Sequence, residues 1–497
     1  MTTSRDGEGL FPAGTLKSCL VLAVSFLLSR LAYFAAGVRF LDNLAELYQV
    51  ADLSLLKSDA FRTVLLLHYQ PPLFNLFVGL ILKLAPGNPA FLFQFLHLLF
   101  GLGLTLTLFL LGLRLGLSNR SAFLLALLFS VTPVSLLLEN WAFYTYPVAL
   151  ILVMAALALN LFISTGRQYW LFILFFLVAA LVLTRSMFHP LLALAVPAAL
   201  FVMIPEQRRK IVIAALVPLL VVGLWAVKNY YTVGSLSTSS LLGMNFSKIT
   251  IMQLPGDERT AMYKAGDMSV MGLYSPFMDL DYYRKHTGPL PSFNPTGIQI
   301  MDNERTASGK PNFNNPVYVD ISRRFMADDL AVLRNHPATY AGGVLGALSL
   351  YFQPPHDQVF TPDNVERIGP LLRLFDVVLY GQLSSMFYDN YHREFTSRLD
   401  FRRSAVDIGL FVLTAFVLVL VFWPRWLIGR GFAYAGSAQG MTVWFMLCLL
   451  VYVTLLANLV EIGENARLRY PVEPFFWLLS VMALVELLGG RNSRPDK

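Results

Sequence analysis

Residues 168–184 read QYWLFILFFLVAALVLT and contain no Asp, Glu, Lys or Arg. A run of this length is close to the roughly 20 apolar residues that a helix needs to cross a bilayer. Of the 497 residues, 56% are hydrophobic and 14% are charged, whereas about 25% is the usual charged share in soluble domains. The sequence therefore predicts an all-helical protein that crosses a membrane several times. Five other runs also lack all four charged residue types: residues 121–138, 145–163, 190–204, 211–227 and 441–460.

The basic residues between these runs predict how the chain crosses the membrane. Cytoplasmic loops of membrane proteins carry an excess of Lys and Arg. The basic clusters, such as Arg208-Arg209-Lys210, and both termini fall on one side if ten segments cross: residues 17–37, 91–113, 121–138, 145–163, 168–184, 189–204, 211–227, 405–423, 440–459 and 471–489. This count requires residues 73–86, which contain Lys83, to form an interfacial or re-entrant helix on the outer surface. The net charge of +7 is then a membrane feature, and no nucleic-acid partner is predicted.

Three parts of the chain follow from this topology. Residues 1–227 form a transmembrane module that includes a first outer loop, residues 38–90. Residues 228–404 form a large, mixed and loop-rich outer region, and residues 405–497 form the C-terminal transmembrane helices. Within the outer region, two apolar segments are short or interrupted by charge, and both are predicted to lie on the membrane, although the charge pattern equally allows both to cross: residues 336–355 and 367–387.

The cysteines and the first apolar run carry no chemistry of their own. Cys19 and Cys448 both lie in apolar runs, so they are predicted to be small buried side chains without a disulfide or a metal. The first run contains Arg30 and is long for the apolar core of a signal peptide. It is therefore predicted to be an uncleaved first span.

The stretch HYQPPLF, residues 68–74, predicts a sharp turn before a new helix. Proline has no backbone N–H to donate to the residue four positions earlier, so it disrupts a helix that would continue through it. Proline is favoured, however, in the first turn of a new helix. Pro71 and Pro72 thus predict that a surface helix starts at Leu73. This start would hold His68, Tyr69 and Gln70 above a cavity at the outer face. The alternative is a simple turn in which His68 is an exposed loop residue.

Polar side chains gather at the predicted outer ends of the spans. Ionisable groups at membrane depth are costly and usually face a cavity or one another, which favours one shared cavity that opens outward. Interfacial anchors at the level of the lipid headgroups are the alternative. The residues concerned are Asp42, Glu46, Asp52, His68, Gln70, Glu139, Asn140, Tyr144, Tyr146, Arg185, His189, Lys228, Asn229, Glu464, Asn465, Arg467 and Arg469.

These residue types suggest a chemistry. Carboxylates act as general bases toward hydroxyl groups, and guanidinium groups bind phosphate oxygens in a bidentate fashion. A base and a phosphate site at the outer face suit the transfer of a group from a lipid phosphate. Glu139 and Glu464 could each orient a nearby Arg or cap a helix start, and a structural role is predicted for Glu139.

Five stretches together resemble one family. They are RFLDNLAELYQ (39–49), HYQPPLF (68–74), ENWAFYTYP (139–147), TRSMFHPL (184–191) and ENARLRYPVEP (464–474). In order and spacing they resemble the GT-C superfamily of polytopic glycosyltransferases, in particular the dolichyl-phosphate-mannose protein mannosyltransferase group (family 39) and its bacterial relatives. Two departures are Asn43, where many relatives have a second acidic residue, and Tyr48, which lies further along than the expected Tyr.

The resemblance implies roles for individual residues. The base is expected soon after the first span, and Asp42 and Asp52 both remain candidates; as a pair they could also be taken for metal ligands, although no metal is expected. Substrate-binding roles are implied for His68, Gln70, Tyr144, His189 and Asn465. Phosphate-binding roles are implied for Arg185, Lys228, Arg467 and Arg469.

The implied activity is an inverting, cofactor-free transfer of a sugar from a polyprenyl-phosphate donor to an acceptor hydroxyl on a protein, lipid or glycan. A lipid-linked glycan ligase or polymerase, and a transporter for a lipid-linked or anionic substrate, are the alternatives, followed by a non-catalytic scaffold. A transporter would be expected to show an internal repeat and broken mid-membrane helices. The Ala- and Leu-rich spans favour a bacterial inner membrane over the endoplasmic reticulum.

Overall fold

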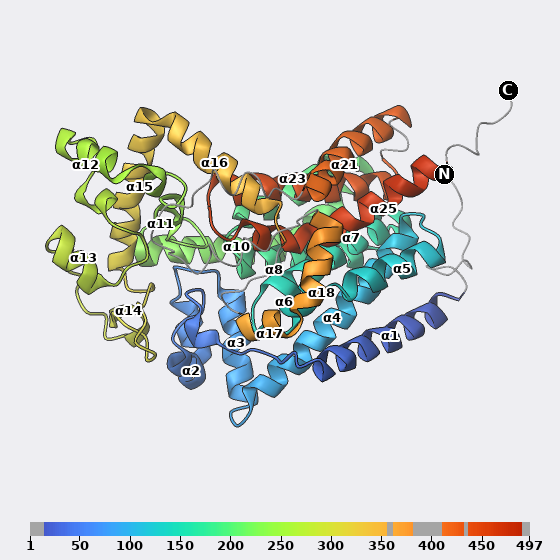
Figure 1. Ribbon diagram of the computed structural model, residues 1–497, viewed down its shortest axis with the longest axis horizontal. Helices are drawn as coiled ribbons and strands as arrows, with labels where there is room; N and C mark the ends of the chain where they lie inside the picture. The colour runs from blue at the N-terminus through green and yellow to red at the C-terminus, as the bar shows by residue number, and fades with distance from the viewer. Residues whose placement is uncertain (1–13, 355–360, 381–409, 432–435, 490–497) are drawn as a thin grey trace.

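The computed structural model describes residues 14–354, 361–380, 410–431 and 436–489. Within these residues the chain forms helices and no β-strand. Among the described residues, extended segments pair at two isolated bridges, Leu41 with Trp141 and Arg305 with Pro311. Figure 1 shows a bundle of long helices with a group of shorter helices at one end. The prediction of an all-helical chain is confirmed for the described residues.

Six helices of the described part are long and apolar enough to cross a membrane. Each coincides with a predicted span, which confirms a helical membrane protein at this level. They are α1 (Thr15–Ala35), α4 (Pro89–Arg114), α7 (Thr145–Thr165), Pro205–Val233 with α10 (Arg208–Val233), α23 (Ala438–Leu459), and Asn465–Leu488 with α24 (Asn465–Arg469) and most of α25 (Glu473–Gly489).

The other four predicted spans are bent or short, so the count of ten is not confirmed. Residues 121–138 form two helices, α5 (Asn119–Ser130) and α6 (Pro133–Glu139), bent by 60°. Pro133 has no N–H to continue α5, and the Thr132 hydroxyl caps α6 by accepting a hydrogen bond from the Ser135 amide. The short helices are α8 (Gln168–Thr184), α9 (Pro190–Met203) and the Thr414–Gly429 part of α21 (Leu410–Gly429).

The HYQPPLF stretch starts a helix as predicted, one residue early. Helix α3 (Pro72–Leu84) begins at the second proline, and Pro71 precedes it in an extended conformation. Helix α3 packs against α2 (Leu53–Leu65) and against α8. It has 13 residues and is shorter than the helices that can span a membrane.

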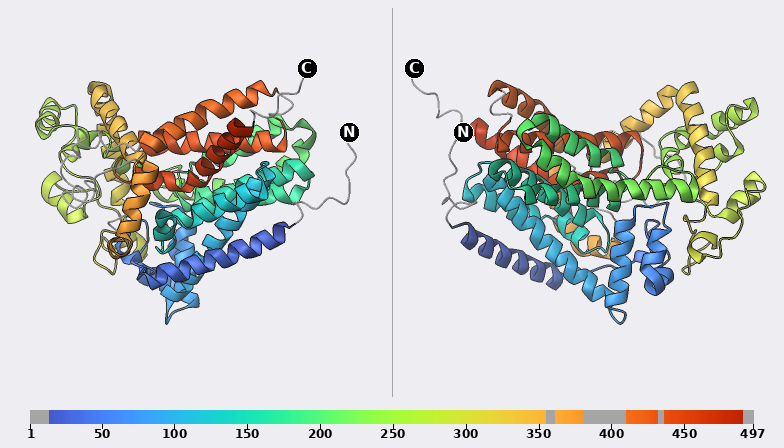
Figure 2. Two further views of the ribbon diagram at one scale, coloured as in Figure 1. Left: turned by 45° about the vertical axis from the view of Figure 1, so that its right-hand side comes forward. Right: turned by 180° about the vertical axis from the view of Figure 1, so that it is seen from behind.

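The outer region is built from short helices at one end of the bundle. In Figures 1 and 2 they lie opposite the start of α1 and the end of α25. Helix α10 runs past the predicted boundary at residue 227 and ends where Gly234 adopts a φ of 68°. The short helices are α11 (Leu242–Phe246), α12 (Gly256–Ala265), α13 (Leu280–Thr287), α14 (Gln299–Asp302) and α15 (Val317–Asn335).

Two further segments lead from this region back to the bundle. Most of the predicted segment 336–355 forms helix α16 (Pro337–Tyr351). This helix packs against α23 and α24. The second predicted surface segment begins as α18 (Gly369–Phe375) after the short α17 (Pro362–Arg367). Its remainder, from residue 381, lies outside the described residues.

A buried ion pair ties α1 to α6 inside the bundle. Arg30 donates from Nε to Glu139 Oε1 over 2.9 Å and from Nη2 to Oε2 over 2.5 Å. Tyr146 donates its hydroxyl to the same carboxylate over 3.2 Å. The glutamate therefore has the structural role predicted for it, and Arg30 is its partner.

Candidate functional site

Five charged side chains gather where α8, α23, α24 and the outer region meet, and we call them the arginine cluster. They are Arg185, Lys248, Glu461, Glu464 and Arg467. Lys248 Nζ lies 2.8 Å from Glu461 Oε1, and Arg467 pairs with Glu464. Arg185, at the end of α8, interacts electrostatically with Glu461, Glu464 and Arg467. Three cations and two carboxylates leave the cluster with a formal charge of +1.

Arg185 carries the remaining positive charge of the arginine cluster, because Lys248 pairs with Glu461 and Arg467 pairs with Glu464. Its side chain is 4% exposed, and its guanidinium makes no hydrogen bond to the described residues; its Nη1 is fully buried. Its guanidinium carbon lies 5.2 Å from the centre of the Tyr144 ring. A buried charge without a hydrogen-bonding partner costs several kcal/mol. An anion placed against Arg185 would remove this cost.

Aromatic rings form the floor of the arginine cluster. Arg467 Cζ lies 4.8 Å from the centre of the Phe143 ring and 5.4 Å from that of Trp141. The Trp141 and Phe143 rings stack at 4.5 Å, and Phe74 of α3 packs edge-on against Tyr144 at 5.1 Å. The ENWAFYTYP stretch thus positions both guanidinium groups through ring contacts.

Asp42 lies on a segment that is joined to this aromatic floor. Leu41 pairs with residues 140–142: its N–H donates to the Asn140 carbonyl, and its carbonyl accepts from the Ala142 amide, both over 2.9 Å. Trp141 Nε1 donates to Asn43 Oδ1 over 3.1 Å. Asp42 itself is exposed, and its carboxylate has no hydrogen bond to the described residues. It is therefore available to a substrate.

Asp52 has different surroundings. It is 5% exposed, and Oδ1 accepts from the Ser54 amide over 2.8 Å and from the Ser54 hydroxyl over 2.6 Å. Its Oδ2 accepts from the Ala307 amide over 2.6 Å. Asp52 thus caps α2 and ties it to the outer region. In the described part of the chain, no three His, Cys, Asp or Glu side chains are grouped as a metal site would require.

His68 and Lys228 lie in a second polar group. The ring of His68 is buried, with Nδ1 2.9 Å from Ser240 Oγ and Nε2 2.7 Å from the Asn314 carbonyl oxygen. Burial lowers the pKa of His68 to about 4, so the ring is neutral at pH 7. Lys228 Nζ donates to the Leu67 carbonyl over 2.5 Å. These contacts hold residues 67–69 against the 237–240 loop. His68 is therefore not the exposed loop residue of the alternative prediction.

Of the remaining predicted residues, Asn465 contacts the arginine cluster, since its Nδ2 donates to the Glu461 backbone carbonyl over 3.1 Å; for the others no hydrogen bond to the cluster's side chains is found among the described residues. Arg469 donates to Glu473 over 3.0 Å and to the Gln353 carbonyl over 3.0 Å. Asn465 donates to the Ala457 carbonyl at the end of α23 over 2.8 Å. His189 is exposed and accepts from the Leu191 amide at the start of α9 over 3.2 Å. Gln70 is half-buried. The polar residues therefore form several groups, whereas one shared cavity was expected.

Sequence reasoning missed Lys248 and Glu461. Burial lowers the pKa of Lys248, but Glu461 and Glu464 outweigh this effect and raise it. Glu461 lies three residues before Glu464 and directly after the uncharged run 441–460. The high density of charged residues after this run was the signal that could have identified Glu461. For Lys248 there was none, because its partner is 213 residues away.

No protein-family model, curated protein or solved structure matches this chain. Its function is therefore inferred from the geometry of the arginine cluster and of Asp42.

Proposed function

We propose that the protein is a membrane glycosyltransferase of the GT-C type. It would move a sugar from a polyprenyl-phosphate donor to an acceptor hydroxyl at the outer face of the membrane, which by the expectation above is a bacterial inner membrane. The observation that carries the proposal is Arg185, whose buried guanidinium makes no hydrogen bond to the described part of the chain and lies beside a second arginine. Such a site favours a phosphate, because charge-assisted hydrogen bonds to guanidinium are strong and bidentate. The resemblance in the five sequence stretches supports the same activity.

In this proposal Arg185 and Arg467 hold the donor phosphate. Their charge stabilises the phosphate as the bond to the sugar breaks, since charge develops on the leaving oxygen in the transition state. Lys248, Glu461 and Glu464 keep Arg467 in place and limit the net charge to +1. The aromatic floor keeps water away from the phosphate and strengthens these interactions.

Asp42 is the proposed general base. The acceptor hydroxyl gives its proton to the Asp42 carboxylate while its oxygen attacks the anomeric carbon of the sugar. A new carbon–oxygen bond forms, the bond from this carbon to the phosphate oxygen breaks, and polyprenyl phosphate leaves as a monoester. Displacement from the opposite face inverts the anomeric centre. Asp52 is the weaker candidate, because four protein donors, the Ser54 amide and hydroxyl and the amides of Leu55 and Ala307, already occupy its carboxylate.

The test measures transfer from radiolabelled polyprenyl-phosphate sugars in membranes that contain wild type, Asp42→Asn or Asp52→Asn. We expect Asp42→Asn to lose at least about 100-fold in transfer, the usual share of a general base, and to retain its thermal unfolding midpoint. Asp52→Asn should unfold at a lower temperature, because an amide nitrogen would face an N–H donor, and should lose much less transfer than Asp42→Asn while folded. Wild-type transfer in Asp42→Asn would exclude Asp42 as the base.

A transporter for an anionic substrate is the second candidate, because a buried arginine can also serve a substrate path. Flux of a phosphate-bearing lipid in reconstituted vesicles separates the two functions. Arg185-dependent flux without sugar transfer would overturn the transferase proposal.

A further inference from the structure

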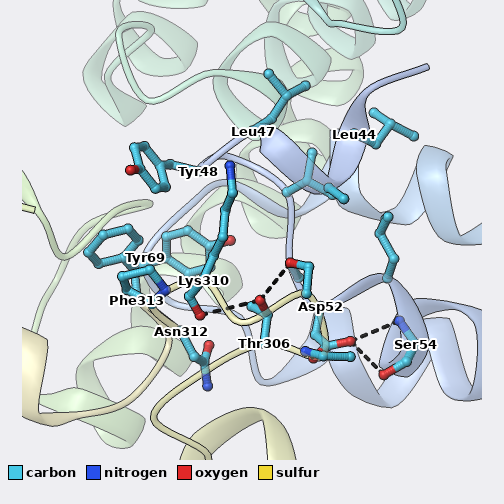
Figure 3. Close-up of a pocket in the computed structure, with 17 residues that line it drawn as sticks. Leu44, Leu47, Tyr48, Asp52, Ser54, Tyr69, Thr306, Lys310, Asn312 and Phe313 are labelled. Atoms are coloured by element: carbon cyan, nitrogen blue, oxygen red, sulfur yellow. Dashed lines mark hydrogen bonds between the residues drawn. The ribbon is translucent and has the colours of Figure 1, made fainter. Parts of the chain in front are cut away.

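A pocket lies between the first outer loop and a turn of the outer region. Its empty space is about 490 Å³ when the open solvent at its mouth is included. One wall is formed by residues 44–54, and the other by residues 306–313. Figure 3 shows the side chains of Tyr48, Asp52, Thr306 and Lys310 around it.

The wall from the outer region is rigidly built. Arg305 and Pro311 form an isolated bridge, and the Thr306 amide donates to the Lys310 carbonyl over 2.8 Å. Gly309 completes the turn with a φ of 81°, a conformation that favours glycine. The hydrogen bond from the Ala307 amide to Asp52 Oδ2 fixes this wall against α2. The pocket is therefore a preformed feature of the outer face.

We propose that this pocket binds a carbohydrate, the acceptor of the transfer reaction. This inference rests on the proposed function, because it names the substrate class of that reaction. The acceptor would therefore be a glycan or a glycolipid headgroup, and not a Ser- or Thr-containing peptide. The proposal is carried by the polarity and charge of the lining and by the position of the pocket relative to Asp42.

The lining combines a flat apolar ring with hydroxyl-binding groups. Tyr48 is 49% exposed, and Phe313 supports its ring edge-on at 5.5 Å. Lys310 Nζ lies 5.6 Å from the centre of the Tyr48 ring and donates to the Glu46 carbonyl over 3.0 Å, which uses one of its three N–H groups. Ser308 and Thr306 add hydroxyl groups 3.0 Å apart. A sugar has the matching surface, an apolar C–H face with hydroxyl groups at its edge.

Charge argues for a neutral ligand. The Lys310 ammonium is balanced by the Asp52 carboxylate, and both line the pocket. An anionic ligand gains little from such a pair, since the attraction of one charge offsets the repulsion of the other. The pocket therefore differs from the arginine cluster, where the surplus positive charge suits a phosphate.

The pocket also lies directly after Asp42 in the chain. Leu44 lines the pocket and begins the short helix Leu44–Glu46, and its amide donates to the carbonyl of Asp42, two residues earlier, over 2.6 Å. The residues that carry the proposed base thus continue directly into the pocket wall. A sugar that occupies this pocket lies on the same loop as the proposed base.

Saturation-transfer NMR on the full chain tests the proposal. The probes are methyl glycosides of the common hexoses and N-acetylhexosamines, and the detergent must have no sugar headgroup. We expect at least one glycoside to bind wild type and Tyr48→Phe, which keeps the ring. In Tyr48→Ala its affinity should fall about three- to tenfold, the range of a lost aromatic contact. Tyr263→Ala, at a 43% exposed ring on α12, is the control and should bind as wild type.

The outcomes separate this inference from the proposed function. Asp42→Asn should bind the glycoside as wild type does, although it transfers no sugar. Equal affinity in wild type and Tyr48→Ala, no binding of any glycoside, or Tyr48-dependent binding of a Ser/Thr peptide alone would each overturn the carbohydrate site. Tyr48-dependent glycoside binding in a protein that never consumes a polyprenyl-phosphate donor would support the carbohydrate site and overturn the transferase.

Discussion

Arg185 and Arg469 are both buried arginines near helix ends, yet their surroundings differ. Arg469 is 2% exposed and donates to Glu473 and to the carbonyls of Tyr351 and Gln353. Arg185 is 4% exposed and makes no such hydrogen bond to the described residues. A buried arginine whose guanidinium is hydrogen-bonded to the protein stabilises the fold, whereas a buried arginine without such hydrogen bonds lowers the stability of the fold. From this difference we propose a structural role for Arg469 and a functional role for Arg185.

The matched substitutions Arg185→Gln and Arg469→Gln test this assignment. Removal of the Arg469 charge breaks its buried ion pair with Glu473 and should lower the free energy of unfolding by about 3–5 kcal/mol. Arg185→Gln should leave stability unchanged or raise it, and should lower sugar transfer by about 100-fold or more. Thermal unfolding in detergent and the transfer assay measure both effects. Loss of stability in Arg185→Gln as large as in Arg469→Gln would assign Arg185 to structure.

Asp329 of α15 is a buried carboxyl group whose environment favours the neutral form. Burial raises its pKa to about 8. Its oxygens lie 2.5 Å from the Thr250 hydroxyl and 3.1 Å from the Ser247 hydroxyl. Each of these hydroxyls also lies near a backbone carbonyl four residues earlier, at 2.9 Å and 2.8 Å. When a hydroxyl donates to its backbone carbonyl, the neutral carboxyl group can donate its single proton to that hydroxyl oxygen, while the other hydroxyl donates to the carboxyl group.

This environment predicts a pH dependence of stability. The unfolded state releases the Asp329 proton near pH 4, whereas the folded state holds it up to about pH 8. The folded state therefore binds more protons in between, and stability should fall as pH rises, by at most about 1.4 kcal/mol per pH unit. Asp329→Asn, which mimics the neutral form, should lose this slope, while Asp267→Asn at an exposed site should keep it. Identical thermal unfolding profiles from pH 5 to 8 in wild type and Asp329→Asn would contradict the prediction.

At the scale of elements, α4 depends on one glycine to pass the Arg30–Glu139 pair. A Cβ at Gly101 would lie 2.1 Å from Glu139 Oε2 and 2.9 Å from Phe26 Cζ. Two residues later on the same helix, a Cβ at Gly103 would meet only Leu150, at 3.5 Å. The first contact is a clash with a buried charged group, and the second is an ordinary van der Waals contact.

The two glycines therefore provide a matched pair of alanine substitutions. Gly103→Ala should leave stability unchanged or raise it by up to about 1 kcal/mol, because alanine favours the helix. Gly101→Ala should lower stability by about 1–3 kcal/mol, the usual cost of overpacking, because Glu139 must move away from Arg30. Thermal unfolding midpoints in detergent measure the difference. If Gly101→Ala were as stable as Gly103→Ala, the α1–α4–α6 packing described above would be wrong.

At the scale of the whole molecule, Lys248 links the outer region to the membrane helices. Lys248 lies in the segment that connects α11 to α12, and its partner Glu461 follows α23. Both side chains are about one-fifth exposed, so the pair contributes about 1 kcal/mol after screening by solvent. The same residues neighbour Arg467, and the link therefore joins the position of the outer region to the proposed phosphate site.

Substitution of Lys248 should loosen this link without unfolding the bundle. We expect Lys248→Gln to speed amide hydrogen exchange in residues 242–254 and to weaken donor binding, because Glu461 then competes for Arg467 and Arg185. Lys264→Gln, at an exposed position on α12, is the control. Unchanged exchange in residues 242–254 would show that the outer region is held by other contacts alone.

The sequence by itself determined the helical membrane character of the chain and several helix boundaries. Long uncharged runs, prolines at helix starts and glycines at helix ends act through a few neighbouring residues, so they can be read without a structure. The start of α3 was predicted to within one residue for this reason. The bend at Pro133 carried the same local signal, but the run of apolar residues across it was interpreted as one span.

Only the tertiary structure decided which charged residues have partners. Arg469 meets the Gln353 carbonyl 116 residues away, and Arg30 meets Glu139 109 residues away, so these contacts leave no local pattern in the sequence. The same holds for Asp52, whose carboxylate accepts from Ala307 255 residues away. The sequence does not show whether an arginine or aspartate side chain is hydrogen-bonded in the folded protein. The physical reason is that burial and hydrogen bonding depend on which distant segments pack together.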